Sequence, residues 1–333
     1  MAENASISAM AEELSIELFH YFYWGKIGED NHDWPCENKE AHKAATHPCD
    51  AVFYYDEPYD QKRTYLHTDL KSYGKGSIDK SSIETALISL ANQVSCANIS
   101  SHWSEKHRHG HVPYKVHGLL FIYNHDELYD KDFSHLLSNI DINKLALPSK
   151  TKIFVLGPEE INWLQIVMNN IKNMRGSSRG FRLPLYENCF FNYPQLARKP
   201  NIKLASAKAA TVEMLVGPWI TLEYKEETRS GIVIFYKRQG TTEEEFIYLL
   251  DHLRHYQLLG EEKDIKVYFQ TKHHPIAIVN FQKARQRYLE ELEVNGIQNS
   301  LGIRVSKIET GKLEQIITSY SQTELGMRYE QSV

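Results

Sequence analysis

The chain has 333 residues, of which 42% are hydrophobic, and its formal net charge is −5. This length predicts a real hydrophobic core and two domains, since domains commonly have about 100–200 residues. The acidic average gives no sign of nucleic-acid binding by the chain as a whole, although a local basic patch can differ from the average. Four cysteines without paired spacing exclude a disulfide framework and suit a reducing cytosol.

Targeting signals are also missing from the sequence. The N-terminal stretch MAENASISAMAEEL has neither a basic segment nor a long apolar run, so we expect no signal peptide. The longest apolar runs, such as GLLFIY, are too short to span a membrane. We therefore expect a cytoplasmic protein without a membrane segment.

In the N-terminal half, the sequence predicts the order helix, strand, strand, helix, strand, strand. Apolar residues at spacings of three and four predict a first helix over residues 7–24, and the polar stretch 25–49 predicts a loop. A second helix begins with Ser81 and Glu84 in capping-box spacing. Runs of aromatic, branched or apolar residues predict four strands, over residues 50–56, 64–72, 114–124 and 150–157.

The sequence of the C-terminal half predicts a second α/β domain. After a helix over 158–174, no clear element is predicted up to residue 217. The elements predicted beyond it are a hairpin of WITLEYKEE and SGIVIFYKR, a helix with a capping box at Thr241 and Glu244, a strand DIKVYFQ, a basic amphipathic helix over 279–294 and a last strand GIRVSKI. We expect an N-terminal domain of residues 1–160, a basic connecting segment 161–217, and an α/β domain 218–333.

An acidic residue stands two positions before a lysine six times in the chain, and one of these triplets stands out. Asp69-Leu70-Lys71 ends a predicted strand, and side chains at positions i and i+2 of a strand share a face. A turn centred near residues 59 and 60 places Asp50, at the start of the preceding strand, directly opposite Asp69, with Cβ atoms about 5 Å apart. Two such carboxylates repel each other, and a divalent cation such as Mg²⁺ is their usual partner. The alternative is a surface hairpin with a ladder of solvated charges.

An acidic first helix, Asp50, then Asp69-Leu70-Lys71 and a following helix together resemble the PD-(D/E)XK nuclease superfamily. Its restriction-endonuclease-like core has the order helix, three strands, helix, strand, and the resemblance covers about residues 8–157. Cys49 stands where the proline of the name would be. The resemblance implies that Asp50, Asp69 and the main-chain carbonyl of Leu70 bind Mg²⁺ or Mn²⁺. Lys71 would position or activate the attacking water.

Some members of this superfamily use further residues, and the sequence offers candidates for them. Glu17 of the first helix fits the position of an additional metal ligand, and Gln93 is a candidate for a glutamine on the following helix. His67 shares the strand face of Asp69 and Lys71, and we expect a half-exposed strand histidine.

The resemblance implies a magnesium-dependent nuclease that hydrolyses phosphodiester bonds, of DNA rather than RNA. A nuclease of this kind with an unfamiliar second domain is similar to effector subunits of bacterial anti-phage defence systems. We therefore expect a partner protein or self-association, through residues 218–333. The alternatives are a non-catalytic DNA-binding or scaffold subunit on the same fold, and an unrelated α/β metalloenzyme.

The stretch 163–212 has a charge opposite to that of the whole chain. Its eight basic residues and one acidic residue give a net charge of +7, and aromatic residues are interleaved. Basic side chains neutralise phosphates and aromatic rings stack on exposed bases, so we expect nucleic-acid contacts here. The candidates are Arg175, Arg179, Arg182 and Lys199. A basic surface facing an acidic partner is the alternative.

Two histidine-rich stretches raise the question of zinc. Cys36, His42, His47 and Cys49 follow the pattern C-x5-H-x4-H-x-C, which is not a standard finger or ribbon spacing. Residues 102–111, HWSEKHRHGH, also offer several imidazoles. We expect an unstructured or substrate-facing loop for the first stretch and a polar loop near DNA for the second, with zinc as the alternative at each.

Overall fold

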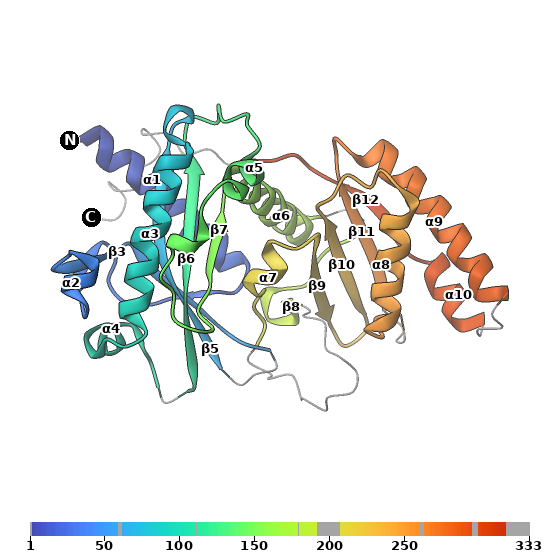
Figure 1. Ribbon diagram of the computed structural model, residues 1–333. Coiled ribbons are helices and arrows are strands. Elements are labelled where there is room, and N and C mark those ends of the chain that lie inside the picture. The colour runs from blue at the N-terminus through green and yellow to red at the C-terminus, as the bar shows by residue number, and fades with distance from the viewer. Residues whose placement is uncertain are drawn as a thin grey trace. The chain divides into compact units, whose positions relative to one another are not determined.

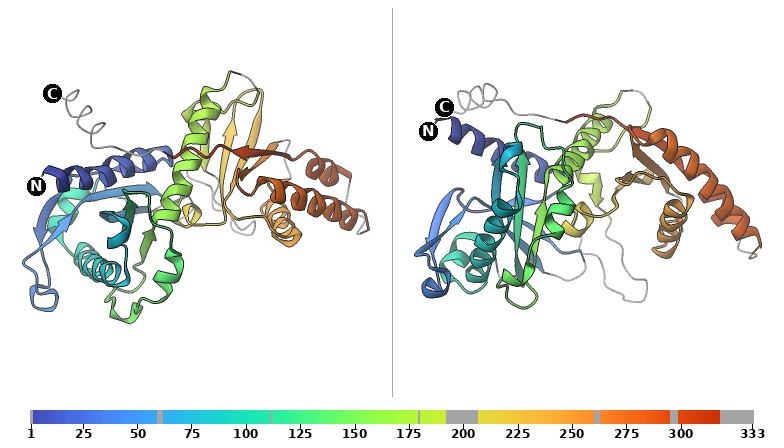
Figure 2. Two further views of the ribbon diagram at one scale, coloured as in Figure 1. Left: turned by 90° about the horizontal axis from the view of Figure 1, so that it is seen from above. Right: turned by 45° about the horizontal axis from the view of Figure 1, so that its top comes forward.

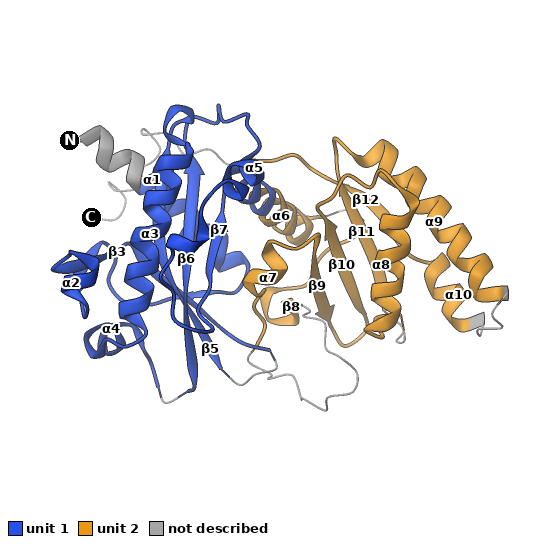
Figure 3. Cartoon of the chain, in the orientation of Figure 1, with its two compact units in different colours: residues 1–164, 318–333 blue, residues 165–317 orange. Residues whose placement is uncertain are grey.

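The computed structural model describes residues 2–58, 62–110, 112–178, 180–191, 207–259, 263–294 and 299–317. The described chain forms two compact units, which lie within residues 1–164 and 165–317 (Figure 3). Each unit contains a five-stranded mixed sheet with helices, so the fold is α/β in both, as predicted (Figure 1). Among the described residues, no helix is long and apolar enough to cross a membrane.

The sheet of the first unit has the strand order β1-β4-β5-β6-β7. β4 runs antiparallel to both β1 and β5, whereas β5, β6 and β7 are parallel. The strands are β1 (Gly25–Lys26), β4 (Ala51–Asp56), β5 (Arg63–Tyr73), β6 (Tyr114–Asn124) and β7 (Ile153–Leu156). The helices of this unit are α1 (Ala2–Tyr21), α2 (Lys39–His42), α3 (Lys80–Ala97), α4 (Ser101–His107) and α5 (Phe133–Ser138). When only the strands of this sheet and the helices α1 and α3 are considered, the order along the chain to β6 is α1, β1, β4, β5, α3, β6, which is the expected helix, three strands, helix and strand.

Helices α1 and α3 cover opposite faces of this sheet (Figure 2). Phe19 of α1 packs edge-on against Phe53 of β4 and Phe121 of β6. The neighbours of Phe121 on the strand, Leu120 and Ile122, belong to the core cluster that includes α3. Because successive residues of a strand point to opposite faces, the two helices bury the two sides of the same strands.

The hairpin of β4 and β5 has the predicted register. Ala51 pairs with Thr68 and Val52 pairs with His67, so the next position outward places Asp50 opposite Asp69. The prediction of a loop over residues 25–49 is wrong, because this stretch contains β1, β2 (His32–Pro35), α2 and β3 (Thr46–Cys49). Strands β2 and β3 form a separate antiparallel pair. These elements have two to four residues, too few for an alternating apolar pattern to show.

The sheet of the second unit has the strand order β12-β11-β10-β9-β8. β8, β9 and β10 are antiparallel neighbours, and β10, β11 and β12 are parallel. The strands are β8 (Cys189–Phe191), β9 (Trp219–Lys225), β10 (Ser230–Tyr236), β11 (Asp264–Gln270) and β12 (Glu309–Leu313). The remaining helices are α6 (Pro158–Gly176), α7 (Val212–Leu215), α8 (Glu243–His255), α9 (His274–Val294) and α10 (Asn299–Ser306).

The core of the second unit lies between the sheet and helices α8 and α9. Ile232, Ile234 and Tyr236, alternate residues of β10, pack in one cluster with Phe246 of α8 and Phe281 of α9. The predicted hairpin, helix and strand after residue 218 correspond to β9, β10, α8 and β11. β8 pairs with β9, so part of the predicted connecting segment 161–217 contributes to this sheet.

Three local predictions about where elements lie or begin need correction. Residues 302–308, predicted as the last strand, lie mostly in α10, where Val305 is buried against the core, and the last strand is β12. The N-cap of α8 is Thr242, one residue after the predicted box, because its hydroxyl accepts the Glu245 N–H. The N-cap of α3 is Asp79, whose carboxylate accepts the Ser82 N–H. An aspartate cap satisfies the first turn as well as a serine does.

Candidate active site

The structure brings Asp50, Leu70 and Lys71 together at the end of the β4–β5 hairpin. Asp50 directly precedes β4, and its Oδ2 atom accepts a 2.7 Å hydrogen bond from the main-chain N–H of Leu70. Lys71 Nζ lies 2.5 Å from Asp69 Oδ1 in an ion pair. Asp69 is 5% exposed, whereas a third of the Lys71 side chain reaches solvent. The site thus pairs the buried Asp69 carboxylate with the half-buried Asp50 carboxylate, and places one partly exposed ammonium group beside them.

The pKa values of Asp50 and Lys71 depend on the charges of their neighbours. Burial, followed by the neighbouring Asp69 carboxylate, raises the pKa of Asp50 to about 7, although the Leu70 N–H and Lys71 oppose the rise. Burial alone would lower the pKa of Lys71, but the Asp69 and Asp50 carboxylates and Tyr73 together raise it above its ordinary value. Lys71 is therefore protonated at neutral pH. One ammonium group does not fully compensate two carboxylates, one buried and one half-buried, and a divalent cation fits this deficit.

His67 lies two residues before Asp69 on the same face of β5, and it links this strand to α3. His67 is fully buried, so the prediction of a half-exposed histidine is wrong, because α3 and α4 cover this face of the strand. Its Nδ1 accepts a 3.2 Å hydrogen bond from Trp103 Nε1, which leaves Nε2 to donate to Gln93 Oε1 at 2.9 Å. Burial lowers the pKa of His67 to about 4, so the ring is neutral at physiological pH. His67 and Gln93 hold the strand that carries Asp69 against α3.

Residues 1–160 match the family model described as the GAPS4 protein PD-(D/E)XK nuclease domain. Residues 1–160 are a PD-(D/E)XK nuclease domain. GAPS4 is an anti-phage defence protein. No curated protein and no solved structure gives a significant match to the chain. The resemblance noted in the sequence, over about residues 8–157, is thereby confirmed at the level of the family.

The first helix of the nuclease domain is linked to Asp50 through a residue that sequence reasoning missed. The main-chain N–H of Asn31 donates to the Asp50 carbonyl at 3.2 Å, and its side-chain amide donates to Glu12 Oε2 of α1, also at 3.2 Å. Asn31 has a positive φ of 49°, a conformation that asparagine tolerates better than most residues. Glu17 is half-buried on α1, on the sheet face opposite to Asp69, and its role as a metal ligand stays a prediction.

The prediction of a polar loop over residues 102–111 is wrong for most of this stretch. Residues 101–107 form α4, and Trp103 and His107 point into the protein core rather than toward solvent. The spacing of these two side chains, four residues apart, is that of one helix face. Lys106 contacts Glu29 at 3.7 Å, so part of the positive charge of this stretch is paired.

The candidate nucleic-acid residues belong to the second unit, where only some lie among the described residues. Arg182 is exposed and donates through Nε to the Arg175 carbonyl at 3.1 Å. The Arg175 guanidinium lies over the Tyr186 ring, 5.4 Å from its centroid. Arg179 and Lys199 lie outside the described residues. Phe191, one of the interleaved aromatics, is buried, so it packs in the protein rather than offering a surface for bases.

Proposed function

We propose that the nuclease domain hydrolyses phosphodiester bonds of DNA with Mg²⁺, or Mn²⁺, as the metal. The observation that carries this proposal is the contact of Asp50 with the Leu70 N–H beside the Asp69–Lys71 ion pair. These are the residues that the family pattern assigns to catalysis, and the match of residues 1–160 to a PD-(D/E)XK family supports the assignment.

Asp50, Asp69 and the Leu70 carbonyl would hold the metal ion. The N–H and C=O of one strand residue point toward the same neighbouring strand, so the Leu70 carbonyl faces the side of Asp50, where its N–H already binds. Hard oxygen ligands of this kind suit Mg²⁺. When bound, the metal neutralises charge on the phosphate oxygens and lowers the pKa of a water molecule.

Lys71 supplies the remaining chemistry from the protein itself. Its ammonium group is protonated, partly exposed and fixed by Asp69, so it can donate hydrogen bonds at a defined place. Donation to the attacking water orients that water toward phosphorus. Donation to a non-bridging phosphate oxygen instead stabilises the charge that develops there.

We further propose that the basic stretch 163–212 contacts the phosphate backbone, through Arg175, Arg179, Arg182 and Lys199. Its net charge of +7 in a chain of net charge −5 supports this role. Within residues 218–333 we propose an association surface, for a partner protein or for a second copy. Ile276 and Val279 support it, because these apolar side chains lie one turn apart on α9 and are 59% and 48% exposed.

The membership of the domain in a defence family supports a role of the chain as a cytoplasmic effector against phage. The direct test is to incubate the purified chain with linear and with circular DNA, and with RNA of the same sequence, in Mg²⁺ or in chelator. Cleavage of DNA that requires the metal and is strongly reduced in Lys71→Ala supports the proposal. DNA binding without cleavage under every metal condition would favour the alternative, a non-catalytic DNA-binding or scaffold subunit.

A further inference from the structure

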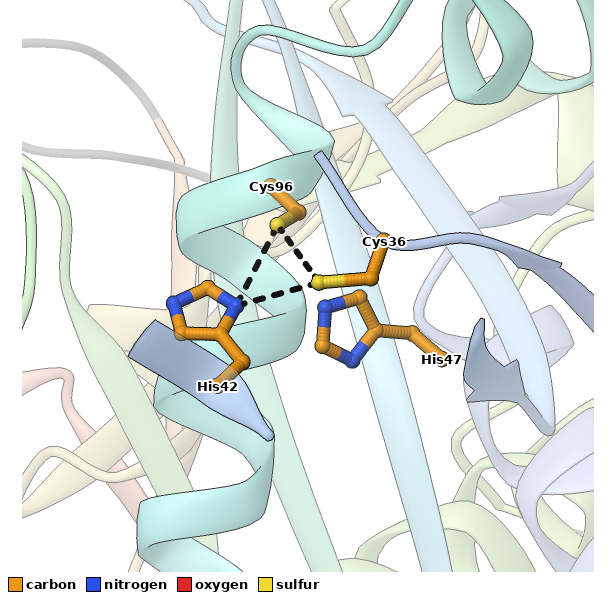
Figure 4. Close-up of side chains that lie close together, drawn as sticks. All are labelled: Cys36, His42, His47 and Cys96. Carbon is orange, nitrogen blue, oxygen red and sulfur yellow. Dashed lines mark hydrogen bonds between the residues drawn. The ribbon is translucent and has the colours of Figure 1, made fainter. Parts of the chain in front are cut away.

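Two cysteines and two histidines meet beside the small β2–β3 sheet of the nuclease domain, away from Asp69 and Lys71. Cys36 directly follows β2, His42 ends α2, His47 lies in β3 and Cys96 lies in the last turn of α3. One donor atom of each lies within 4.8 Å of one donor atom of every other. Figure 4 shows the four side chains converging on one point from these separate elements.

The three distances among Cys36, His42 and Cys96 are those of a tetrahedral metal site. The Sγ atoms of Cys36 and Cys96 are 3.8 Å apart, and His42 Nδ1 lies 3.4 Å from each of them. Zinc bonds of about 2.3 Å to sulfur and about 2.0 Å to nitrogen place tetrahedral ligands about 3.8 Å apart for two sulfurs and about 3.5 Å apart for sulfur and nitrogen. A disulfide would instead need a separation of about 2.05 Å.

The surroundings of these side chains also point to a ligand. Cys36, His47 and Cys96 are 4%, 4% and 1% exposed. His47 Nε2 is buried and has no hydrogen-bond partner among the described residues, although a buried polar atom normally has one. Burial raises the pKa of the Cys96 thiol, and hydrogen bonds from the main-chain N–H groups of Glu37 and Asn38 oppose that rise. Such N–H groups favour a thiolate and commonly support metal-bound cysteines.

We propose that Cys36, His42, His47 and Cys96 bind one structural zinc ion. Two thiolates and two imidazoles in tetrahedral arrangement are a typical zinc set, and four protein ligands leave no open position for catalysis. The zinc alternative considered from the sequence included Cys49 as the fourth ligand. In the fold, the cysteine beside Cys36 is instead Cys96, which is 60 residues further along the chain and lies on α3.

A zinc ion at this place would brace the active site. His47 stands three residues before Asp50, and Cys96 stands three residues after Gln93, which binds His67. The ion would therefore join the strand that leads into Asp50 to the helix that holds β5. Short strands with little apolar surface gain most from such a link, because metal binding then contributes directly to folding.

A second group, His32, Cys49 and His107, lies nearby and serves as the internal control. It offers three donors among the described residues, and Cys49 Sγ lies 4.0 Å from His107 Nε2 and 3.8 Å from His67 Nδ1. We assign no metal to it, because the group has three donors within the described part of the chain, and the neighbouring His67 already binds Trp103 and Gln93 through its two ring nitrogens.

The zinc content of the purified full chain, measured by elemental analysis, tests the proposal without reference to cleavage. We expect about one zinc per chain in the wild type, and none in Cys36→Ser or in Cys96→Ser. Cys49→Ser and Cys189→Ser, which also remove buried cysteines, should retain it. A wild-type chain without zinc, or zinc that is absent from Cys49→Ser and present in Cys96→Ser, would overturn the assignment.

A second measurement on the wild-type chain covers the case in which the cysteine variants fail to fold. After removal of zinc with a chelator, Co²⁺ should restore the thermal midpoint. It should also give the intense visible absorption of a tetrahedral ion, together with a thiolate charge-transfer band. A Co²⁺ spectrum that lacks the thiolate band, or that is weak as for six oxygen ligands, would contradict the cluster as its site. The Asp50→Asn variant should give the same spectrum as the wild type, since the two metal sites are separate.

Discussion

The main-chain N–H of Leu70 donates a 2.7 Å hydrogen bond to Asp50, across the end of the β4–β5 hairpin. This contact fixes Asp50 beside the two residues that flank Leu70, and Asp69 and Lys71 project from the same strand face. The carboxylates and the ammonium group are thereby held together by the main chain and not only by side-chain charges. A change at any one of them alters the electrostatics of the other two.

Lys71→Ala should lower the rate of DNA cleavage by about 10²–10³-fold, as expected for the loss of one well-placed donor. The fold should persist, because Lys71 is partly exposed and lies at the end of the site. The measurement is single-turnover cleavage of DNA in saturating Mg²⁺, with circular dichroism to verify folding. Lys75→Ala is the matched control, since Lys75 pairs with the exposed Asp130 and this variant should cleave normally. Equal rates for Lys71→Ala and the wild type would exclude the proposed role.

Asp50→Asn and Asp69→Asn should each weaken Mg²⁺ binding by more than about tenfold, because the site loses an anionic oxygen ligand. In Asp50→Asn the amide oxygen of the new side chain can still accept the Leu70 N–H, so the hairpin should remain intact. Titration calorimetry with Mg²⁺ and Mn²⁺ measures the effect. Asp56→Asn, at the far end of the same hairpin and paired with Arg63, is the control. Parental affinity in both site variants would mean that these carboxylates do not hold the metal.

The pKa of Asp50, raised to about 7 by burial and by Asp69, predicts a pH dependence with a definite sign. Between its ordinary value near 4 and about 7, the folded protein retains a proton that the unfolded chain has lost. The free energy of unfolding of the metal-free protein should therefore fall as pH rises through this window. Mg²⁺ competes with the same proton, so its affinity should increase as pH rises through about 7. Thermal unfolding and calorimetry at several pH values test both trends, and Asp50→Asn should flatten them.

Reversal of Arg175, Arg179 and Arg182 to glutamate should weaken DNA binding. The slope of log affinity against log salt should decrease by about 0.9 for each phosphate that the protein no longer neutralises. Fluorescence anisotropy with duplex DNA over a range of salt gives both quantities. Arg287→Glu controls for the change of charge, since this exposed arginine of α9 pairs with Glu244 and Glu291. An unchanged slope would assign the basic stretch to a protein interface instead of DNA.

Ile276→Glu together with Val279→Glu should disrupt an association through the second unit, because charge on an apolar contact is costly to bury. Light scattering of the full chain detects self-association, and affinity capture from native cells detects a partner protein. Ile142→Glu, at an exposed apolar residue of the nuclease domain, is the control and should leave association unchanged. A wild-type chain that is monomeric, captures no partner and still cleaves DNA would contradict the proposed association.

Local sequence determined the part of the site that depends on neighbouring residues. The two-residue period of a strand puts Asp69 and Lys71 on one face, and the length of the turn sets the register that brings Asp50 opposite Asp69. Both rules act over a few residues, so the predicted hairpin and the observed one agree. The apolar runs of β6, β9 and β10 were equally clear, because long buried strands carry a strong pattern.

Tertiary structure decided the contacts between residues that are far apart in the chain. Only the packing of α3 on the sheet buries His67 against Gln93 and delivers Cys96 to Cys36, His42 and His47. The spacing of residues within a short segment carries no information about a ligand supplied by a distant helix. For the same reason the zinc alternative considered from the sequence included Cys49, the nearest cysteine along the chain, whereas the cysteine that lies beside Cys36 and His42 in space is Cys96.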